Sequence, residues 1–348
     1  MARKESANGD GRGEREDHRH LPQSDRASLT DDELRALTRE LAKRLAGSVD
    51  SPLLYIFCPE DVQLAKEHAV TIYTLLREQK TNLPSLHIFI HSGGGDIAAA
   101  YDIISLACQY TDGNVTAIVP LYAMSAATLI GIGADGVIMS KIGKLGPLDS
   151  QIFNPRLGYW VPVRAVTDVP RVLEQELHKF EGRGTGLRPD RNINIKAQTI
   201  IKPMADQVDP YLLAAHARSG EGARKYGERV MSMRKAMVAP ERVSKCLQHL
   251  TVGYPIHGFE LDLMELKESP LFRSVVNSVP AAPAVEQQMM DFLTTLMALE
   301  QKHQEMGEPL SAPLIDLIRP TVRHPGTQAG RRRGRPAAKR QTDAPQKE

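Results

Sequence analysis

Between residues 53 and 140 the chain alternates short apolar runs with longer amphipathic stretches, and this alternation limits the possible folds most strongly. Four apolar runs have the length of β-strands, namely LLYIF, LHIFI, VTAIVPLY and GVIMS. Three stretches between them are typical of helices, namely AKEHAVTIYTLLREQK, DIAAAYDIISLACQY and MSAATLIGIGA. Strands that alternate with helices form crossover βαβ units around a mainly parallel sheet. We therefore expect an α/β fold.

Five segments are predicted along the chain. Residues 1–28 are charged and without periodicity, which predicts disorder. Residues 29–48 predict an amphipathic helix that begins with a capping box of Thr30 and Glu33. Residues 49–280 should form the α/β domain, residues 281–318 a C-terminal helical segment and residues 319–348 a disordered basic tail.

The pattern weakens after residue 150. We expect helical stretches near 170–180, 195–217 and 222–237, and a Gly/Arg/Pro-rich loop at 182–191. Residues 252–266 predict a turn, a short strand and the start of a helix, and residues 284–302 predict a last helix with a broad apolar face. The leucine stripe of 34–45 and the methionine-rich stripe of 289–299 offer more apolar surface than one domain edge should expose, which predicts a homo-oligomer.

Composition favours a protein of the reducing cytoplasm. The three cysteines, Cys58, Cys108 and Cys246, show no CxxC spacing, which argues against a disulfide framework and a structural zinc site. The first twenty residues lack an apolar core, so no signal peptide is expected. Residues 113–134 carry no charge, but Pro120 and two glycines interrupt them, which favours a strand and a buried helix over a membrane span. No metal or cofactor is predicted.

Two strand-to-helix junctions carry candidate chemistry. Residues 91–96, HSGGGD, permit positive φ angles and can turn backbone N–H groups toward a ligand. Their spacing fits neither GxxxxGK[ST] nor GxGxxG, which excludes the common phosphate loops. About thirty residues later, Ser125 lies among small residues in YAMSAAT, where it can either cap a helix or expose a nucleophilic hydroxyl.

The two junctions together resemble the superfamily of ClpP, signal-peptide peptidase A and crotonase. The run IFIHSGGGDIAAAYDIISLA with VTAIVPLYAMSAATLIGIGADGVIMSKIGKLGPLDSQI is similar to the serine dehydrogenase proteinase family, as are IKPMADQVDPYLL and YPIHGF. The resemblance covers about residues 50–275. It implies a ClpP/crotonase-like spiral of βαβ units with flanking helices, a protein or peptide substrate, and a homo-oligomer. It also makes Ser125 the nucleophile, with the amides of Gly94 and Ala126 as the oxyanion hole.

The sequence departs from the ClpP pattern at several positions. His91 and Gly93 stand where ClpP-like peptidases usually have Asn and Pro, and Ala127 replaces a usual Gly. The position of the ClpP general base falls near Asp149 or Ser150, and neither is a histidine. The identity of the base is therefore open.

A serine hydroxyl needs a neighbouring group to accept its proton. His257 in YPIHGF is the preferred candidate, oriented by Asp149, because imidazole titrates near neutral pH. A serine–lysine dyad is the alternative, with Lys141, Lys144 or Lys196 as the base. A structural role in a turn for His257 and solvated surface positions for the lysines are the simpler explanations.

Other functions remain open. A catalytically inactive ClpP-like scaffold could bind a protein partner or DNA, and acyl-CoA chemistry would need a thioester pocket that the sequence does not identify. The tail contains RRRGRP, in which Arg333 and Arg335 resemble the core of an AT-hook. Positive charge alone also attracts phosphate, so non-specific nucleic-acid binding through the tail is the simpler prediction.

Overall fold

A six-stranded sheet forms the centre of the protein in the computed structural model, which describes residues 26–149, 151–154, 158–162, 171, 172, 175 and 210–320. The strand order is β10-β1-β2-β3-β5-β9, and every neighbouring pair is parallel except β10 with β1. The strands are β1 (Leu53–Phe57), β2 (Leu86–His91), β3 (Val115–Val119), β5 (Gly136–Met139), β9 (Ser278–Pro280) and β10 (Leu314–Ile318). The predicted α/β class with a mainly parallel sheet is confirmed.

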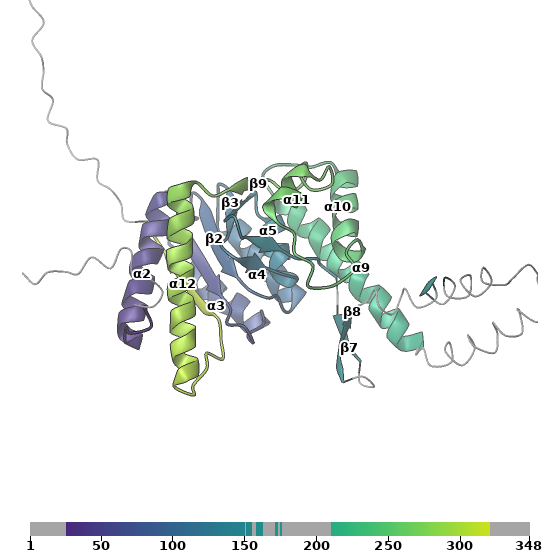
Figure 1. The fold of residues 1–348 in the computed structure, drawn as a ribbon. Coiled ribbons are helices and arrows are strands. Elements are labelled where there is room, and N and C mark those ends of the chain that lie inside the picture. The colour runs from purple at the N-terminus through teal and green to yellow at the C-terminus, as the bar shows by residue number, and fades with distance from the viewer. Residues whose placement is uncertain are drawn as a thin grey trace, which may run out of the picture.

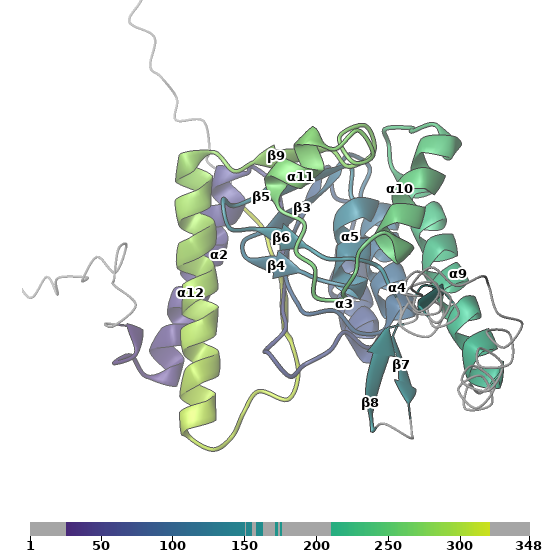
Figure 2. The ribbon, with the colours of Figure 1, turned by 45° about the vertical axis from the view of Figure 1, so that its right-hand side comes forward.

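Alternate side chains of each strand enter two different apolar cores, because successive residues of a strand point to opposite faces. Leu54 and Ile56 of β1 join the core on one face, whereas Leu53 and Phe57 join the core on the other. The first face is covered by α3 (Lys66–Arg77), α4 (Ile97–Gln109), α5 (Ala126–Gly133), α9 (Pro210–Met233), α10 (Pro240–Val252) and α11 (Leu263–Glu268). The second is covered by α2 (Asp31–Ser48) and α12 (Pro283–Glu305), which lie side by side in Figures 1 and 2.

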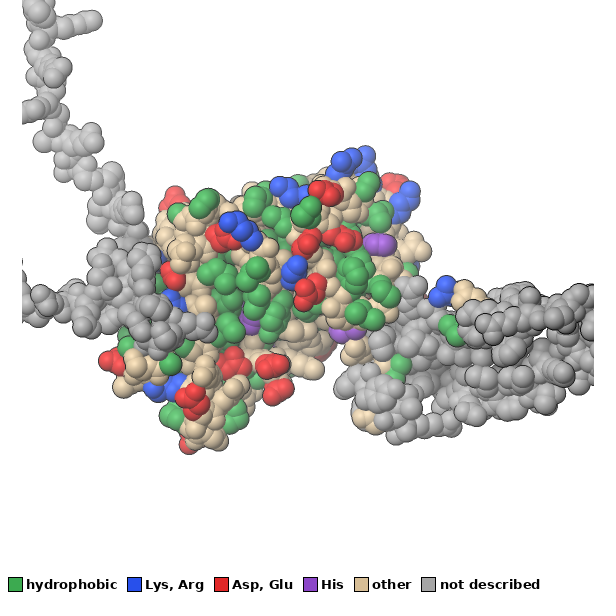
Figure 3. Space-filling view, in the orientation of Figure 1, with side chains coloured by type: hydrophobic (Ala, Val, Ile, Leu, Met, Phe, Trp, Pro, Cys, Tyr) green, Lys and Arg blue, Asp and Glu red, His purple; other side chains and the backbone are tan. Residues whose placement is uncertain are grey.

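Two small strand pairs accompany the sheet. β4 (Tyr122–Ala123) pairs in parallel with β6 (Lys144–Leu145), and β7 (Gln151–Asn154) pairs antiparallel with β8 (Tyr159–Pro162). On the face drawn in Figure 3, hydrophobic side chains alternate with acidic and basic ones over the described surface. None of the described helices has the length and apolar character that crossing a membrane would need. The uncharged stretch 113–134 forms β3, β4 and the buried helix α5.

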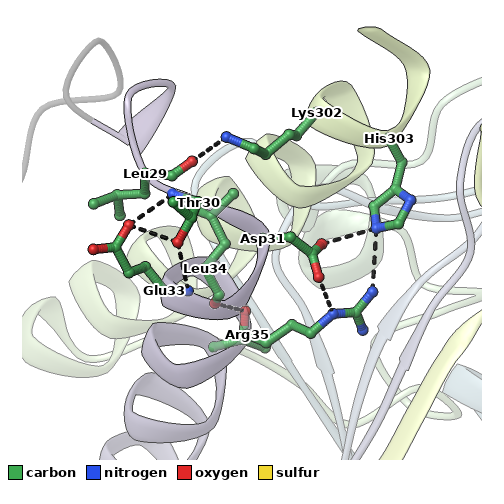
Figure 4. A network of polar contacts seen from close by, with 9 residues as sticks. Leu29, Thr30, Asp31, Glu33, Leu34, Arg35, Lys302 and His303 are labelled. Atoms are coloured by element: carbon green, nitrogen blue, oxygen red, sulfur yellow. Dashed lines mark hydrogen bonds and ion pairs between the residues drawn. The ribbon is translucent and has the colours of Figure 1, made fainter. Parts of the chain in front are cut away.

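Polar contacts fasten α2 to α12 (Figure 4). The predicted capping box is present: the Glu33 N–H donates to Thr30 Oγ1, and the Thr30 N–H donates to Glu33 Oε2. Asp31 accepts hydrogen bonds from Arg35 Nε at 2.6 Å and from His303 Nε2 of α12 at 2.9 Å. Arg35 lowers the pKa of Asp31, chiefly through this hydrogen bond.

One described residue of each predicted disordered segment, Arg26 and Arg319, contacts the folded part of the protein. Arg26, within the segment 1–28, is buried and forms an ion pair of 3.0 Å with Asp291 of α12. Arg319, the first residue of the predicted tail, donates from Nε to Gln79 at 3.0 Å. Long-range partners therefore hold these two residues, and residues 1–25 and 321–348 lie outside the described residues.

Several predicted elements need correction. Residues 210–233 form one helix, α9, where a break between two helices was expected, and the strand expected within 252–266 is reduced to a single bridge between Leu261 and Leu145. The segment 281–318, expected to be helical, also supplies β10 to the central sheet. Helix α10 was not predicted. The loop 182–191 and most of the stretch 170–180 lie outside the described residues.

Candidate active site

The two candidate junctions lie next to each other because β2 and β3 are parallel neighbours whose carboxyl ends meet at one edge of the sheet. The Ser92 N–H donates to Tyr122 O at 3.2 Å, and the Met124 N–H donates to Ser92 O at 2.9 Å. These two hydrogen bonds tie the glycine turn that follows β2 to the segment that precedes Ser125. Catalytic groups commonly gather at this edge of parallel sheets.

Ser125 has a strained backbone conformation. Its φ is 50° and its ψ is −122°, and its side chain makes no capping hydrogen bond to α5. Ser125 stands at the N-cap position of α5, but its hydroxyl does not act as a side-chain cap. A tight strand-to-helix turn of this kind presents a hydroxyl at the sheet edge.

Close packing requires a glycine at position 94 beside Ser125, and hydrogen bonds of Thr128 hold the helix that follows Ser125. A Cβ at Gly94, whose φ is 113°, would lie 2.8 Å from the Ser125 Cβ, so a glycine is required there. The Thr128 hydroxyl donates to Ala123 O at 2.7 Å and accepts from the Gly146 N–H at 2.9 Å. Thr128 thereby fixes the first turn of α5 to the loop that carries Asp149.

His257 and Asp149 form an oriented pair. His257 Nδ1 lies 2.6 Å from Asp149 Oδ1, and the Asp149 side chain is only 9% exposed. A carboxylate at Nδ1 accepts a hydrogen bond from the Nδ1–H group, which leaves the lone pair of Nε2 free to accept a proton. Backbone hydrogen bonds hold the pair in place, because Leu145 and Leu261 exchange two bonds of 2.9 Å and the Leu148 N–H donates to Leu250 O at 2.8 Å.

One cavity of about 410 Å³ brings these groups together. Ser125, Ala126, Asp149 and His257 all line it. The other lining residues are Gln63, Gly93, Gly95, Asp96, Ile97, Leu148, Gln151 and Ser219. The predicted nucleophile, base and orienting acid thus share one cavity, although His257 is more than 100 residues from the other two in the chain.

The two described lysines that were considered as alternative bases, Lys141 and Lys144, lie near carboxylates and not on the cavity wall. The Lys141 side chain is 88% exposed and lies 3.7 Å from Glu286. Lys144 Nζ lies 3.9 Å from both Glu260 and Asp262. Neither lysine lines the cavity that contains Ser125. Lys196, Arg333 and Arg335 lie outside the described residues, as does Ser150.

The two predicted oxyanion donors differ in their surroundings. Ala126 is the first residue of α5, where a backbone N–H has no partner within the helix, and it lines the cavity. The Gly94 N–H instead donates to Ser92 Oγ at 3.1 Å. The sequence analysis missed Ser92, although a serine two residues before a turn amide is a common side-chain partner for such an amide.

His91, one of the departures from the ClpP pattern, has a packing role. It is buried, stacks on Phe57 with ring centroids 5.1 Å apart, and contacts the Tyr122 ring at 4.0 Å. Burial lowers the pKa of His91 to about 4, so the ring is neutral at neutral pH. Within the described residues, no three His, Cys, Asp or Glu side chains come together as a metal site would require.

Part of the chain is similar in sequence to known proteins. Two curated relatives are uncharacterized proteins of Methanocaldococcus jannaschii: MJ1495 is 31% identical over 121 residues, and MJ0137 is 40% identical over 67 residues. These matches cover 34% and 19% of this chain, but only 41% and 23% of the relatives' own lengths.

Two solved structures from Listeria monocytogenes share low sequence identity with the chain. ClpP1 is 12% identical, with a TM-score of 0.33 over 67% of this chain and 94% of its own. A point mutant of the same ClpP1 is 14% identical, with a TM-score of 0.32 over 70% of this chain and 99% of its own.

A family model agrees with the predicted resemblance. It matches residues 63–169, and the family is described as ClpP-like SDH-type serine proteinase. This segment contains the glycine turn, Ser125 and Asp149, whereas His257 lies outside it. Residues 63–169 are therefore similar to the ClpP-like SDH-type serine proteinase family, as the two strand-to-helix junctions predicted.

Proposed function

We propose that the protein is a serine hydrolase that cleaves peptide bonds in protein or peptide substrates through an acyl-enzyme on Ser125. One observation carries this proposal: the His257–Asp149 pair, 2.6 Å apart, opens onto the same cavity as Ser125. A nucleophile, an imidazole and a buried carboxylate are the three groups that acyl transfer needs at neutral pH. The family match over residues 63–169 supports the same reaction class.

The groups act in sequence. Ser125 Oγ attacks the carbonyl carbon while His257 Nε2 accepts the hydroxyl proton, and Asp149 stabilises the imidazolium through Nδ1. Collapse of the tetrahedral intermediate breaks the C–N bond, and His257 returns the proton to the departing amine. Water then attacks the acyl-enzyme by the same route and releases the carboxylic acid and free Ser125. The Ala126 N–H, at the positive end of α5, stabilises the oxyanion in both steps.

A fluorophosphonate probe tests the nucleophile. We expect wild-type protein to gain one probe adduct on Ser125, detected by mass spectrometry of tryptic peptides, and Ser125→Ala to gain none. Ser219→Ala is the matched control, because Ser219 lines the same cavity and should leave labelling unchanged. A folded wild-type protein that takes up no probe would instead support the inactive scaffold.

A further inference from the structure

The glycine turn beside Ser125 is held by a buried hydrogen bond. The Gly94 N–H donates to Ser92 Oγ at 3.1 Å, and Ser92 has no exposed surface. Gly93 and Gly95 line the cavity that contains Ser125, but Gly94 does not. The Gly94 N–H, which was expected to stabilise an oxyanion, thus donates to Ser92 instead, and Gly94 does not line the cavity.

Peptide geometry makes this contact consequential. In a trans peptide the C=O and N–H groups point in opposite directions, so the Gly93 carbonyl points away from Ser92 when the Gly94 N–H points toward it. No cis peptide bond occurs among the described residues. A carbonyl oxygen repels a developing oxyanion, whereas an N–H donor stabilises it.

We propose that Ser92 is a positioning residue that withholds the Gly94 N–H from Ser125 until the Gly93–Gly94 peptide reverses. This inference rests on the proposed hydrolase function. Reversal exchanges the carbonyl for the amide on the cavity side and completes the oxyanion hole with Ala126. Because the reversal breaks the contact with Ser92, that contact sets the fraction of molecules that are ready to react.

The neighbouring backbone confines the movement to one peptide. Ser92 is fixed on one side by its two hydrogen bonds to Tyr122 and Met124. Gly94 is fixed on the other side, because its carbonyl accepts from the Leu64 N–H at 2.8 Å. Only ψ of Gly93 and φ of Gly94 need to change, and a glycine tolerates either sign of φ.

The Ser92 hydroxyl is itself held on its other side. Burial raises the pKa of Cys58 to about 11, and a hydrogen bond with Ser92 opposes that rise. Cys58 is therefore a neutral thiol at neutral pH. Contacts with Cys58 and Gly94 together fix the orientation of the Ser92 side chain.

Ser92→Ala tests the proposal through the kinetics of fluorophosphonate labelling. Removing one neutral hydrogen bond should raise the maximal labelling rate of Ser125 between about threefold and tenfold, with the half-saturating probe concentration unchanged. Ser140→Ala, which also removes a buried serine hydroxyl, should not label faster. An unchanged or slower rate in folded Ser92→Ala overturns the proposal.

A second measurement does not depend on activity. In wild-type protein, residue-resolved hydrogen exchange should find the Gly94 amide protected and the Gly93 amide fast. In Ser92→Ala, protection of Gly94 should fall about tenfold or more, because the amide loses its one acceptor. Fast exchange of Gly94 in wild-type protein overturns the proposal whatever the labelling shows. If no variant labels but Gly94 is protected, the hydrolase function fails while the Ser92 contact stands.

Discussion

At the scale of the residue, the backbone of Ser125 combines strain with a position on the cavity wall. Its φ of 50° lies where a side chain meets its own backbone, so the packing around Gly94 and Thr128 must hold it there. Functional sites commonly store strain in this way. The cost of the conformation falls on stability, and its benefit is access to the hydroxyl.

Replacing Ser125 by Gly and by Ala separates these two effects. Both variants should lose probe labelling, but Ser125→Gly should be the more stable of the two by about 1 kcal/mol, because glycine adopts positive φ without steric cost. Urea unfolding followed by circular dichroism measures the difference. Equal stabilities would show that the turn relaxes in the alanine variant.

The role of His257 as the base gives a second prediction. His257→Ala should abolish labelling of Ser125 and leave the melting temperature within a few degrees, because His257 lies on the cavity wall and in neither apolar core. Activity-based labelling and thermal melting of the same sample check both parts. If labelling survives there and vanishes at Lys141→Ala or Lys144→Ala, a serine–lysine dyad replaces the triad. A large loss of stability would assign His257 a structural role.

The three candidate catalytic groups were predicted from the sequence, but the state of the oxyanion turn was not. Ser125 was proposed because its junction follows a glycine turn at a fixed spacing, and His257 because YPIHGF resembles a segment of the same family and imidazole titrates near neutral pH. Glycine itself accepts both orientations of the Gly93–Gly94 peptide, so the local signal was Ser92, two residues before the Gly94 amide, and it was overlooked. A buried hydrogen bond from the Gly94 N–H to Ser92 Oγ decides the orientation.

At the scale of the element, local signals explain which helices and strands were foreseen. Helix α2 has a complete capping box, and α12 has an apolar face, so both were predicted. Strand β10 was missed because Asp316 interrupts its apolar run and because its partner, β1, lies far away in the chain. Helix α10 carried a signal that was overlooked: Pro240 at its first turn, with Val243, Cys246, Leu247 and Leu250 at helical spacing.

The Asp31 contacts should make the packing of α2 on α12 depend on pH. A lowered pKa in the folded state means that the contribution of Asp31 to stability is present above its ordinary pKa of 3.8 and is lost as pH falls through the folded value. Asp31→Asn should therefore be less stable than wild type at pH 7, by up to about 1 kcal/mol, with the difference shrinking below about pH 4.

Denaturant unfolding at several pH values measures this difference. Asp32→Asn is the matched control, because Asp32 is the next residue in the same first turn, is exposed, and shares any effect of the helix dipole. A deficit of Asp31→Asn that stays constant down to about pH 3 would contradict the assignment.

At the scale of the whole molecule, the structure removes one of the two arguments for a homo-oligomer, the exposed apolar stripes, and leaves the family resemblance unaffected. The leucine stripe of α2 and the methionine-rich stripe of α12 are buried against the sheet and each other, so they offer no face to a second copy. Large hydrophobic side chains are exposed elsewhere, among them Val252, Ile256 and Met264, which flank the segment that carries His257.

A homo-oligomer is still predicted, now because these large hydrophobic side chains are exposed. Light scattering at micromolar concentration should give a mass above the 38.4 kDa of one chain. Ile256→Ser combined with Met264→Ser should shift that mass downward, because both side chains are more than half exposed. The same pair of substitutions at Val70 and Met306, exposed on other elements, serves as the control. A monomeric wild-type mass would refute the prediction.

The basic tail gives the last prediction. Removal of residues 321–348 should leave folding and probe labelling intact but abolish DNA binding that weakens with salt, because each neutralised phosphate releases counterions. Electrophoretic mobility shifts at two salt concentrations measure this. A preference for A·T-rich duplex that Arg333→Ala or Arg335→Ala erases would support the AT-hook. Equal binding by the truncated protein would place the site on the folded domain.

The division of the catalytic groups between two distant stretches makes this chain a candidate split enzyme. One fragment, ending near residue 162, would hold the nucleophile and the acid, and the other, from residue 210, would hold the base together with β9 and β10. Neither fragment alone has a complete sheet or a complete triad. Turnover would appear only when the two fragments associate, so hydrolysis of a fluorogenic peptide would report on their reunion.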